Sequence, residues 1–131
     1  NYKSAEHFYF QRMAMYHEKH ALAEQMGKCE TAREVKLLSK QITPDPSWKD
    51  LKMRIMYEGV AQKFQHTEFK KALLSTQKKV LGEASRDEYW GIGMTLTNPK
   101  VFDQSMWKSN KMGQILMKVR EELTANKSNK S

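Results

Sequence analysis

Apolar residues recur at three- and four-residue steps over most of the chain, and this spacing predicts a mostly helical protein. Ser4 is a suitable cap for a first helix that runs to about Met26 and stops at Gly27. The positions that we expect to be buried in this helix are Phe8, Met15, Leu22 and Met26.

Three further helices are predicted in the middle of the chain. Thr31-Ala-Arg-Glu34 has the form of a capping box and opens a short helix that turns Val35 and Leu38 inward. A third helix is predicted over 46–64, because proline suits a first helical position, and a fourth over 68–76. The expected apolar faces are Trp48, Leu51, Ile55 and Met56 in the third helix and Phe69 and Leu73 in the fourth.

Two short segments are predicted to be extended. Residues 79–83 are too few for a helix, and residues 89–94 hold two glycines, which disfavour a helix interior. The last helix carries apolar residues at i, i+3, i+4, i+7 and i+11, namely Met112, Ile115, Leu116, Val119 and Leu123. The pattern predicts an α+β fold, mostly helical, with about five helices and a small sheet of short strands. Since two short strands do not form a stable sheet alone, either they pair locally on the helices or the chain lacks their partner strands.

Composition indicates a single soluble domain, because 131 residues with 39% hydrophobic side chains are enough to bury a core. Cys29 is the one cysteine, so no internal disulfide is possible, and we expect a reducing, cytoplasmic setting. No apolar run approaches the roughly 20 residues of a membrane span, and the polar start argues against a secretion signal, so no membrane partner is expected. The acids are not clustered, and neither a metal nor a cofactor is expected.

The formal net charge is +8, and residues 108–131 contribute half of it, with six Lys and Arg against two Glu. A positive surface favours phosphate-bearing partners, whether nucleic acid or a nucleotide diphosphate. A basic domain that is merely soluble would have the same charge. Residues 125–131 have the composition of a frayed, polar and basic tail.

Two stretches combine acids with aromatic residues. In residues 5–11, Glu6 and His7 precede three aromatic residues, although a carboxylate there also stabilises the positive end of a helix. In residues 81–93, Glu83 and Asp87 bracket a turn that leads to Trp90 and two glycines. Glycines beside an aromatic ring let a ligand approach the backbone while the ring stacks on a base or sugar; the alternative is a turn with a core tryptophan.

A third stretch, residues 107–113, is a polar loop that opens a helix. Exposed amides there, with Lys108, Ser109 and Lys111 close in sequence, would suit a diphosphate cradle. The stretch lacks the glycine spacing of a P-loop, and an ordinary basic helix cap explains it nearly as well.

Taken in order, these segments resemble the NADAR family, also described as YbiA-like N-glycosidases, over residues 2–122. The matching residues are Glu6-His7-Phe8-Tyr9; Trp48, Arg54 and Met56; Lys63-Phe64; Leu73-Leu74-Ser75-Thr76; Glu83-Ala84-Ser85 with Asp87 and Trp90-Gly91-Ile92-Gly93; and Asn110, Gly113, Leu116, Met117 and Arg120. Each motif alone is weak, but six in register are specific. The resemblance implies a YbiA-like fold with a NADAR-like domain over residues 1–124, followed by the tail 125–131.

The same resemblance implies hydrolysis of an N-glycosidic bond at a ribose anomeric carbon. Its first implied substrate is nucleic acid that carries ADP-ribose on guanine. A small nucleotide-like metabolite, such as an intermediate of the riboflavin pathway, is the second. The alternative from another class is a non-catalytic basic module that binds nucleic acid through the last helix.

Site residues are likewise implied by the resemblance. Glu6 would be the lead carboxylate, with Asp87 as its partner and Glu83 as a substitute. Trp90 would stack on the base or ribose, and Lys63 and Asn110 would hold polar groups of the substrate. His7 would orient Glu6, and the other expected substrate-binding residues are Tyr9, Arg12 and Gly91.

The chain departs from the family pattern at two places. Met13 stands where family members usually have a lysine, so a Schiff-base nucleophile is not available at that position. Three alternatives follow: Arg12 acts only electrostatically, water attacks directly, or the activity is altered. The family also carries a segment with one or two strands ahead of the Glu-His helix. That segment is expected to have been cleaved, to come from a second chain as a partner, or to be absent.

Overall fold

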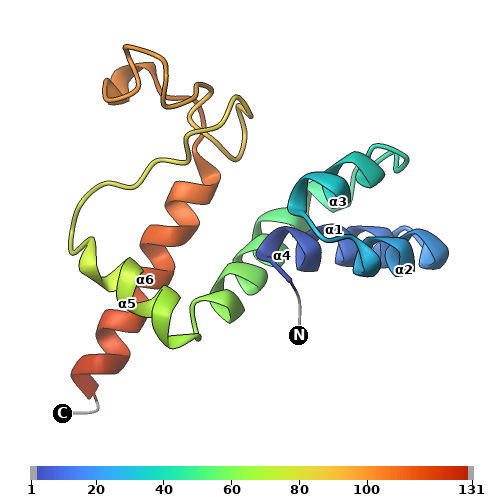
Figure 1. Ribbon diagram of the computed structural model, residues 1–131, viewed down its shortest axis with the longest axis horizontal. Helices are drawn as coiled ribbons and strands as arrows, with labels where there is room; N and C mark the ends of the chain where they lie inside the picture. The colour runs from blue at the N-terminus through green and yellow to red at the C-terminus, as the bar shows by residue number, and fades with distance from the viewer. Residues whose placement is uncertain (1–2, 130–131) are drawn as a thin grey trace. The chain divides into compact units, whose positions relative to one another are not determined.

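The computed structural model describes residues 3–129, and the side chains of residues 3–126. The chain divides into two compact units, unit 1 (Asn1–Gln65) and unit 2 (His66–Ser131), each with its own helices (Figure 1).

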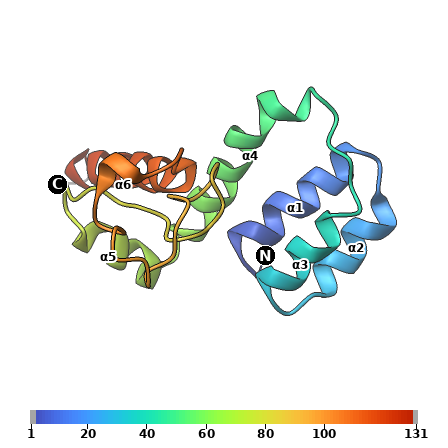
Figure 2. The same ribbon diagram turned by 90° about the horizontal axis from the view of Figure 1, so that it is seen from above.

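Unit 1 has four helices in its described part: α1 (Ala5–Tyr16), α2 (His20–Lys28), α3 (Ala32–Ser39) and α4 (Trp48–Lys63). α1 packs against all three of the others, and α2 also contacts α3 (Figure 2). Their inward faces form the core of the unit, made of Phe8, Tyr9, Met13, Leu22, Met26, Val35, Trp48, Ile55, Met56 and Val60 together with small residues. Gly59 permits the close crossing of α4 on α1, since a Cβ there would lie 2.8 Å from the Phe8 ring.

Local capping signals fix two of these helix starts. The hydroxyl of Ser4 accepts a hydrogen bond from the backbone N–H of His7, which confirms the predicted cap of the first helix. Thr31 and Glu34 form both halves of the predicted capping box at the start of α3.

The prediction of one long first helix up to Met26 is wrong, because the helix breaks after Tyr16. Glu18 has a left-handed φ of 59°, and α2 starts only at His20. The ring of His17 holds the break in place: its Nδ1 donates to the Met13 carbonyl at 2.7 Å, and its Nε2 accepts from the Asp45 amide at 2.9 Å. Met15, predicted to be buried, lies in the last turn of α1, before the break, and is 50% exposed.

Unit 2 contains α5 (Thr67–Ser75), the short 3₁₀ helix η1 (Gln104–Met106) and α6 (Lys111–Asn129). α5 packs against α6, and the buried residues between and around them are Leu73, Ile115, Val119 and Leu123. Arg120, 8% exposed, donates to the Thr76 hydroxyl at 2.8 Å and so ties α6 to the end of α5. Phe69, predicted to share the buried face of α5 with Leu73, is instead 45% exposed.

The last three predicted helices are confirmed by α4, α5 and α6, with ends that differ by a few residues. α6 continues to Asn129, so the residues predicted to be a frayed tail are helical as far as the structure describes them; residues 130–131 lie outside the described range.

The predicted small sheet is wrong, because residues 3–129 include no strand, and they form six α-helices where about five were expected. The segments 79–83 and 89–94 belong to a long irregular connection that runs from α5 to the N-terminal end of α6 (Figure 1). Their backbone groups bond within tight turns and to the residues before α6, so they need no neighbouring strand.

Candidate functional site

Glu6, the expected lead carboxylate, lies in the first turn of α1 and is partly exposed. A carboxylate at this end of a helix is stabilised by the positive helix dipole. Among residues 3–129, no hydrogen bond or ion pair joins its carboxylate to another group. Glu6 is therefore held at the start of a helix and is available to a water molecule or a ligand.

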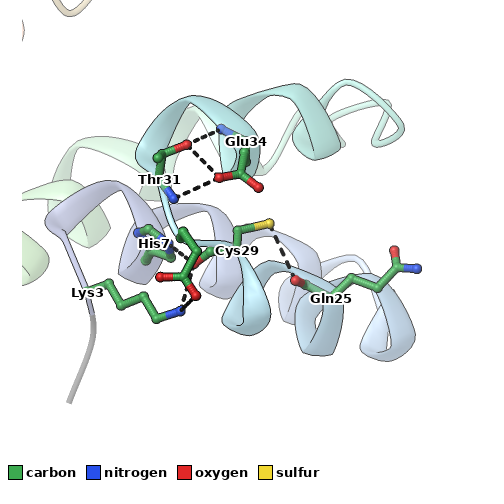
Figure 3. A network of polar contacts seen from close by, with 7 residues as sticks. Lys3, His7, Gln25, Cys29, Thr31 and Glu34 are labelled. Atoms are coloured by element: carbon green, nitrogen blue, oxygen red, sulfur yellow. Dashed lines mark hydrogen bonds and ion pairs between the residues drawn. The ribbon is translucent and has the colours of Figure 1, made fainter.

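His7 bonds to residues other than Glu6. Its side chain is 2% exposed, its Nε2 lies 3.0 Å from the carbonyl oxygen of Cys29, and its Nδ1 lies 2.6 Å from the Ser4 hydroxyl. Because a carbonyl only accepts, Nε2 carries a proton, and in the neutral ring Nδ1 accepts from Ser4. Lys3 donates to the same carbonyl at 2.9 Å (Figure 3). These bonds fasten the start of α1 to the link between α2 and α3, and both ring nitrogens of His7 are occupied.

Two more expected substrate-binding residues of α1 have protein partners. Tyr9 is 4% exposed, and its hydroxyl accepts from the indole N–H of Trp48 at 3.2 Å. Arg12 is exposed and pairs with Glu58 at 3.3 Å, while its guanidinium lies 5.4 Å from the centre of the Phe8 ring. Arg12 also borders a surface hollow of about 360 Å³ that is lined by Gln11, Met15, His20, Ala23 and Glu24 as well.

Met13 and Lys63 complete the unit 1 residues singled out by the sequence. Met13 is 7% exposed and belongs to the core, so this position favours an apolar side chain in this chain. Lys63 is the last residue of α4, and its ammonium lies 5.7 Å from the centre of the Phe64 ring. It follows Gly59 by four residues, so it lies on the face of α4 that crosses the first turn of α1. Helix crossing thus brings the Glu6 and Lys63 ends of the two helices into one region of unit 1.

In unit 2, Asp87 organises the turn that carries Trp90. One carboxylate oxygen, Oδ1, accepts the backbone N–H of Tyr89 at 2.9 Å and that of Trp90 at 2.8 Å. Burial raises the pKa of the Tyr89 phenol, whose ring packs edge-on against Trp90 at 4.7 Å. The second oxygen of Asp87 is the one left for other chemistry.

Gly91 follows in the same turn and leaves no room for a side chain. A Cβ there would lie 2.8 Å from the Ser85 side chain, 2.9 Å from the Asp87 carbonyl and 3.0 Å from the Glu83 carbonyl. The amides of Gly91 and Ile92 donate to those two carbonyls at 3.0 and 2.9 Å. The glycine that the sequence suggested for close ligand approach is thus required by the packing of the turn itself.

Asn110 joins this turn to α6. It has a left-handed φ of 49° and is 7% exposed. Its amide oxygen accepts the Glu83 N–H at 2.9 Å, and its amide nitrogen donates to the Leu81 carbonyl at 3.0 Å. Asn110 therefore positions the backbone of Glu83, one of the candidate acids.

Five consecutive amides before and at the start of α6 are taken by the same turn. The N–H groups of residues 108–112 donate to the carbonyls of residues 88–92, at 2.9 to 3.0 Å, each to a different one. The amides proposed as a diphosphate cradle therefore already have partners, and that interpretation of residues 107–113 is wrong. What remains exposed there are the side chains of Lys108 and Ser109.

The expected site residues are thus shared between the units, with Glu6, His7, Tyr9, Arg12 and Lys63 in unit 1 and Glu83, Asp87, Trp90, Gly91 and Asn110 in unit 2. The sequence missed the anchoring role of Trp107, whose indole N–H donates to the Val101 carbonyl at 2.7 Å. The one signal in the sequence was a large aromatic residue shortly before the last predicted helix. Within the described part of the chain no three His, Cys, Asp or Glu side chains gather as a metal site would require. No helix within residues 3–129 has the length and apolar character needed to cross a membrane.

Comparison with known proteins adds to this geometry. The model of the NADAR domain family matches residues 1–124. The chain is 32% identical over 126 residues to N-glycosidase R617 of Acanthamoeba polyphaga mimivirus, an alignment that covers 92% of this chain and 74% of that protein. It is 32% identical over 109 residues to Protein irg-1 of Caenorhabditis elegans, covering 78% of this chain and 51% of that protein, about half its length. The structure is also similar to the NMR structure of the E. coli protein YbiA, with a TM-score of 0.70 and 23% sequence identity. The match covers 94% of this chain and 68% of the YbiA chain, and it shows a shared fold.

Proposed function

The chain belongs to the NADAR domain family, and from this premise we propose that it hydrolyses an N-glycosidic bond at a ribose anomeric carbon, removing ADP-ribose from guanine in nucleic acid. The observation that carries the proposal is the likeness to a protein named as an N-glycosidase, at 32% identity over 74% of that protein. The basic excess of +8 supports a substrate with phosphate groups.

Glu6 is the residue on which the chemistry of this proposal depends. Its carboxylate is free of protein partners within the described range, so it can accept a hydrogen bond from the attacking water or face the positive charge of an oxocarbenium-like transition state. In the balanced reaction the water oxygen bonds to the anomeric carbon and the carbon–nitrogen bond breaks. Its electron pair stays on the guanine nitrogen, which takes up a proton as ADP-ribose leaves.

The remaining candidate residues have other roles in the proposal. Asp87 would act through Oδ2, since Oδ1 is already hydrogen-bonded to two amides, and Glu83 would be its substitute. Trp90, held by the same two bonds, would stack on the base or ribose. Lys63 and Arg12 would attract the phosphates. Four other residues use their polar groups or their space within the protein and would each support their own unit. In unit 1, His7 bonds to the Cys29 carbonyl and Tyr9 to the Trp48 side chain. In unit 2, Asn110 and Gly91 hold the backbone of the Trp90 turn.

The experiment that tests this proposal compares the chain with its Glu6→Gln variant on an oligonucleotide that carries ADP-ribose on one guanine. Mass spectrometry follows the release of ADP-ribose. We expect release by the chain and a rate lower by about 10² to 10⁴ in Glu6→Gln, the range for loss of a positioned acid or base. Glu24→Gln makes the same chemical change at an exposed position of α2, where the side chain is 75% exposed, and should keep the full rate.

Each result has a separate meaning. Equal rates for the chain and Glu6→Gln would remove Glu6 from the mechanism. Release from free ADP-ribosylated guanosine but not from the oligonucleotide would replace nucleic acid by a small nucleotide-like substrate. No release from either substrate by a folded chain would overturn the glycosidase proposal for this chain.

A further inference from the structure

Residues 94–107, between the Trp90 turn and α6, form a loop whose two ends are held together by hydrogen bonds; it is called the tip loop below. On one side of its base, Gly93 donates to the Ser85 carbonyl at 2.9 Å. Across the base, Lys108 donates to the Ile92 carbonyl at 2.9 Å. The tip loop is therefore joined directly to the turn that carries Trp90, two residues before Ile92.

Hydrogen bonds within the tip loop hold its backbone without any ligand. Successive turns close where Asn98 donates to the Thr95 carbonyl at 3.1 Å and Val101 donates to the Asn98 carbonyl at 3.0 Å. The indole N–H of Trp107 holds the Val101 carbonyl at 2.7 Å, and the Trp107 ring packs so closely on Gly82 that a Cβ there would lie 2.6 Å from it. A loop fixed in this way presents its side chains in defined positions.

This ordered loop exposes large apolar side chains to solvent. Phe102 is 87% exposed and Leu96 is 73% exposed, the two highest values among the large exposed apolar residues of the structure, and Met106 is 46% exposed. Two exposed lysines are close in the sequence, Lys100 two residues before Phe102 and Lys108 two residues after Met106. Asp103, the acid that follows Phe102, accepts hydrogen bonds from Ser105 through Oδ1. Exposed apolar side chains on an ordered loop, with lysines near them, suit a partner with an apolar interior and an anionic edge.

Nucleic acid has that combination, with stacked bases inside and phosphates outside. We propose that the tip loop inserts Phe102, with Leu96 beside it, into the base stack of a nucleic-acid substrate next to the modified guanine, while Lys100 and Lys108 contact the flanking phosphates. The proposal rests on the proposed function. Enzymes that act on a base in a duplex often turn it out of the stack, and an apolar wedge can fill the gap that the base leaves.

The hydrogen bonds between the tip loop and the Trp90 turn keep Phe102, the proposed wedge, in a fixed relation to the Trp90 ring. Since the base of the tip loop is bonded to Ile92 and the turn is held by Asp87, the wedge and the Trp90 ring are parts of one ordered body. Insertion at one side of the vacated position would leave the extruded guanine beside Trp90, the ring proposed to stack on it. A free nucleotide has no stack to open and would make no use of Phe102.

The test measures the rates of the chain and of Phe102→Ala on two substrates, a duplex that carries ADP-ribose on one guanine and free ADP-ribosylated guanosine. We expect Phe102→Ala to lower the rate on the duplex by about tenfold to a hundredfold, the effect of losing one base-stacking ring, and to leave the rate on the free nucleoside unchanged. Phe102→Trp should restore the duplex rate. Phe69→Ala removes another exposed phenylalanine, 45% exposed on α5 of the same unit, and should change neither rate.

A second measurement does not depend on turnover. A duplex with 2-aminopurine next to the target guanine brightens when that base loses its neighbour, so binding of the Glu6→Gln chain should raise its fluorescence and binding of Glu6→Gln with Phe102→Ala should not. Equal fluorescence with and without Phe102, or equal loss of both rates in Phe102→Ala, would overturn the wedge. A change of oligomeric state in Phe102→Ala would instead assign the tip loop to contact between copies of the chain. A failure of the glycosidase proposal would show as no release from either substrate, while the fluorescence would still report on the wedge.

Discussion

Replacing Asn110 by alanine should loosen the Trp90 turn even in the absence of any substrate. The change leaves the Glu83 N–H and the Leu81 carbonyl without their partners, at about 1 kcal/mol each for partly buried groups. It also places a side chain with a Cβ and no local hydrogen bond at a φ of 49°, which costs about 1 kcal/mol more. The sum is about 3 kcal/mol in the free energy of opening the turn.

Hydrogen exchange of the Ile92 amide measures this opening, because that amide donates to the Glu83 carbonyl inside the turn. A loss of about 3 kcal/mol corresponds to exchange faster by roughly two orders of magnitude. Asn110→Gly removes the same two bonds but tolerates the positive φ, so its exchange should increase only about thirtyfold. Asn98→Ala, in which an exposed loop bond to the Lys100 amide is lost, is the control and should leave Ile92 protected.

Two results would refute this reasoning. Unchanged Ile92 exchange in Asn110→Ala would mean that the side chain of Asn110 does not hold the turn and is free for the substrate contact implied by the family resemblance. Equal exchange in Asn110→Ala and Asn110→Gly would mean that the left-handed backbone carries no cost.

Three other outcomes can be checked with standard methods. Gly113→Ala should lower the free energy of unfolding by about 1 to 3 kcal/mol, and with it the melting temperature, because the added Cβ would lie 2.3 Å from the Leu81 carbonyl oxygen. An unchanged melting temperature would contradict that packing. The pKa of Asp45 is lowered by the hydrogen bonds that its carboxylate accepts, first from the Ser47 hydroxyl and then from the Ser47 amide. These bonds are complete above the ordinary pKa and are lost as the pH falls through the lowered value, so an NMR titration of the Ser47 amide should show the loss, and Asp45→Asn should flatten the titration. Burial raises the pKa of Tyr89, so the stability of the protein should fall as the pH rises above about 10. In an ultraviolet titration, Tyr89→Phe should remove a phenol that ionises later than the others. If the late-ionising signal remains in Tyr89→Phe, the expectation is disproved.

Much of the helical structure could be predicted because its signals are local. The capping box at Thr31 and Glu34 and the apolar repeat of the last helix involve residues within a few positions of one another. The break after Tyr16 could not, since no glycine or proline marks it and the bond that holds it comes from Asp45, 28 residues from His17. The missing sheet has the same cause: the glycines near Trp90 suggested an extended segment, but the carbonyls of residues 88–92 bond to the amides of residues 108–112.

The candidate site was predictable to a similar extent. Glu6 could be placed in a first helical turn from the sequence, and the structure has it there with its carboxylate free of described partners. The Cys29 partner of His7 and the two partners of Asn110 could not be predicted, because they are backbone groups 22 to 29 residues away. A polar side chain in a motif looks the same in the sequence whether it faces a substrate or a distant peptide group.

The closed base of the tip loop separates the parts of unit 2 that can vary from those that cannot. Because the Lys108 amide bonds to the Ile92 carbonyl, residues added or removed between 94 and 107 lie outside the bonds that fix the Trp90 turn and the start of α6. Lengthening such a loop is inexpensive, about 0.6 kcal/mol for each doubling. The loop can therefore be exchanged as a cassette, by evolution or by design. Chimaeras that keep Gly93 and Trp107 and carry a relative's residues between them should keep the turn intact while their substrate preference changes.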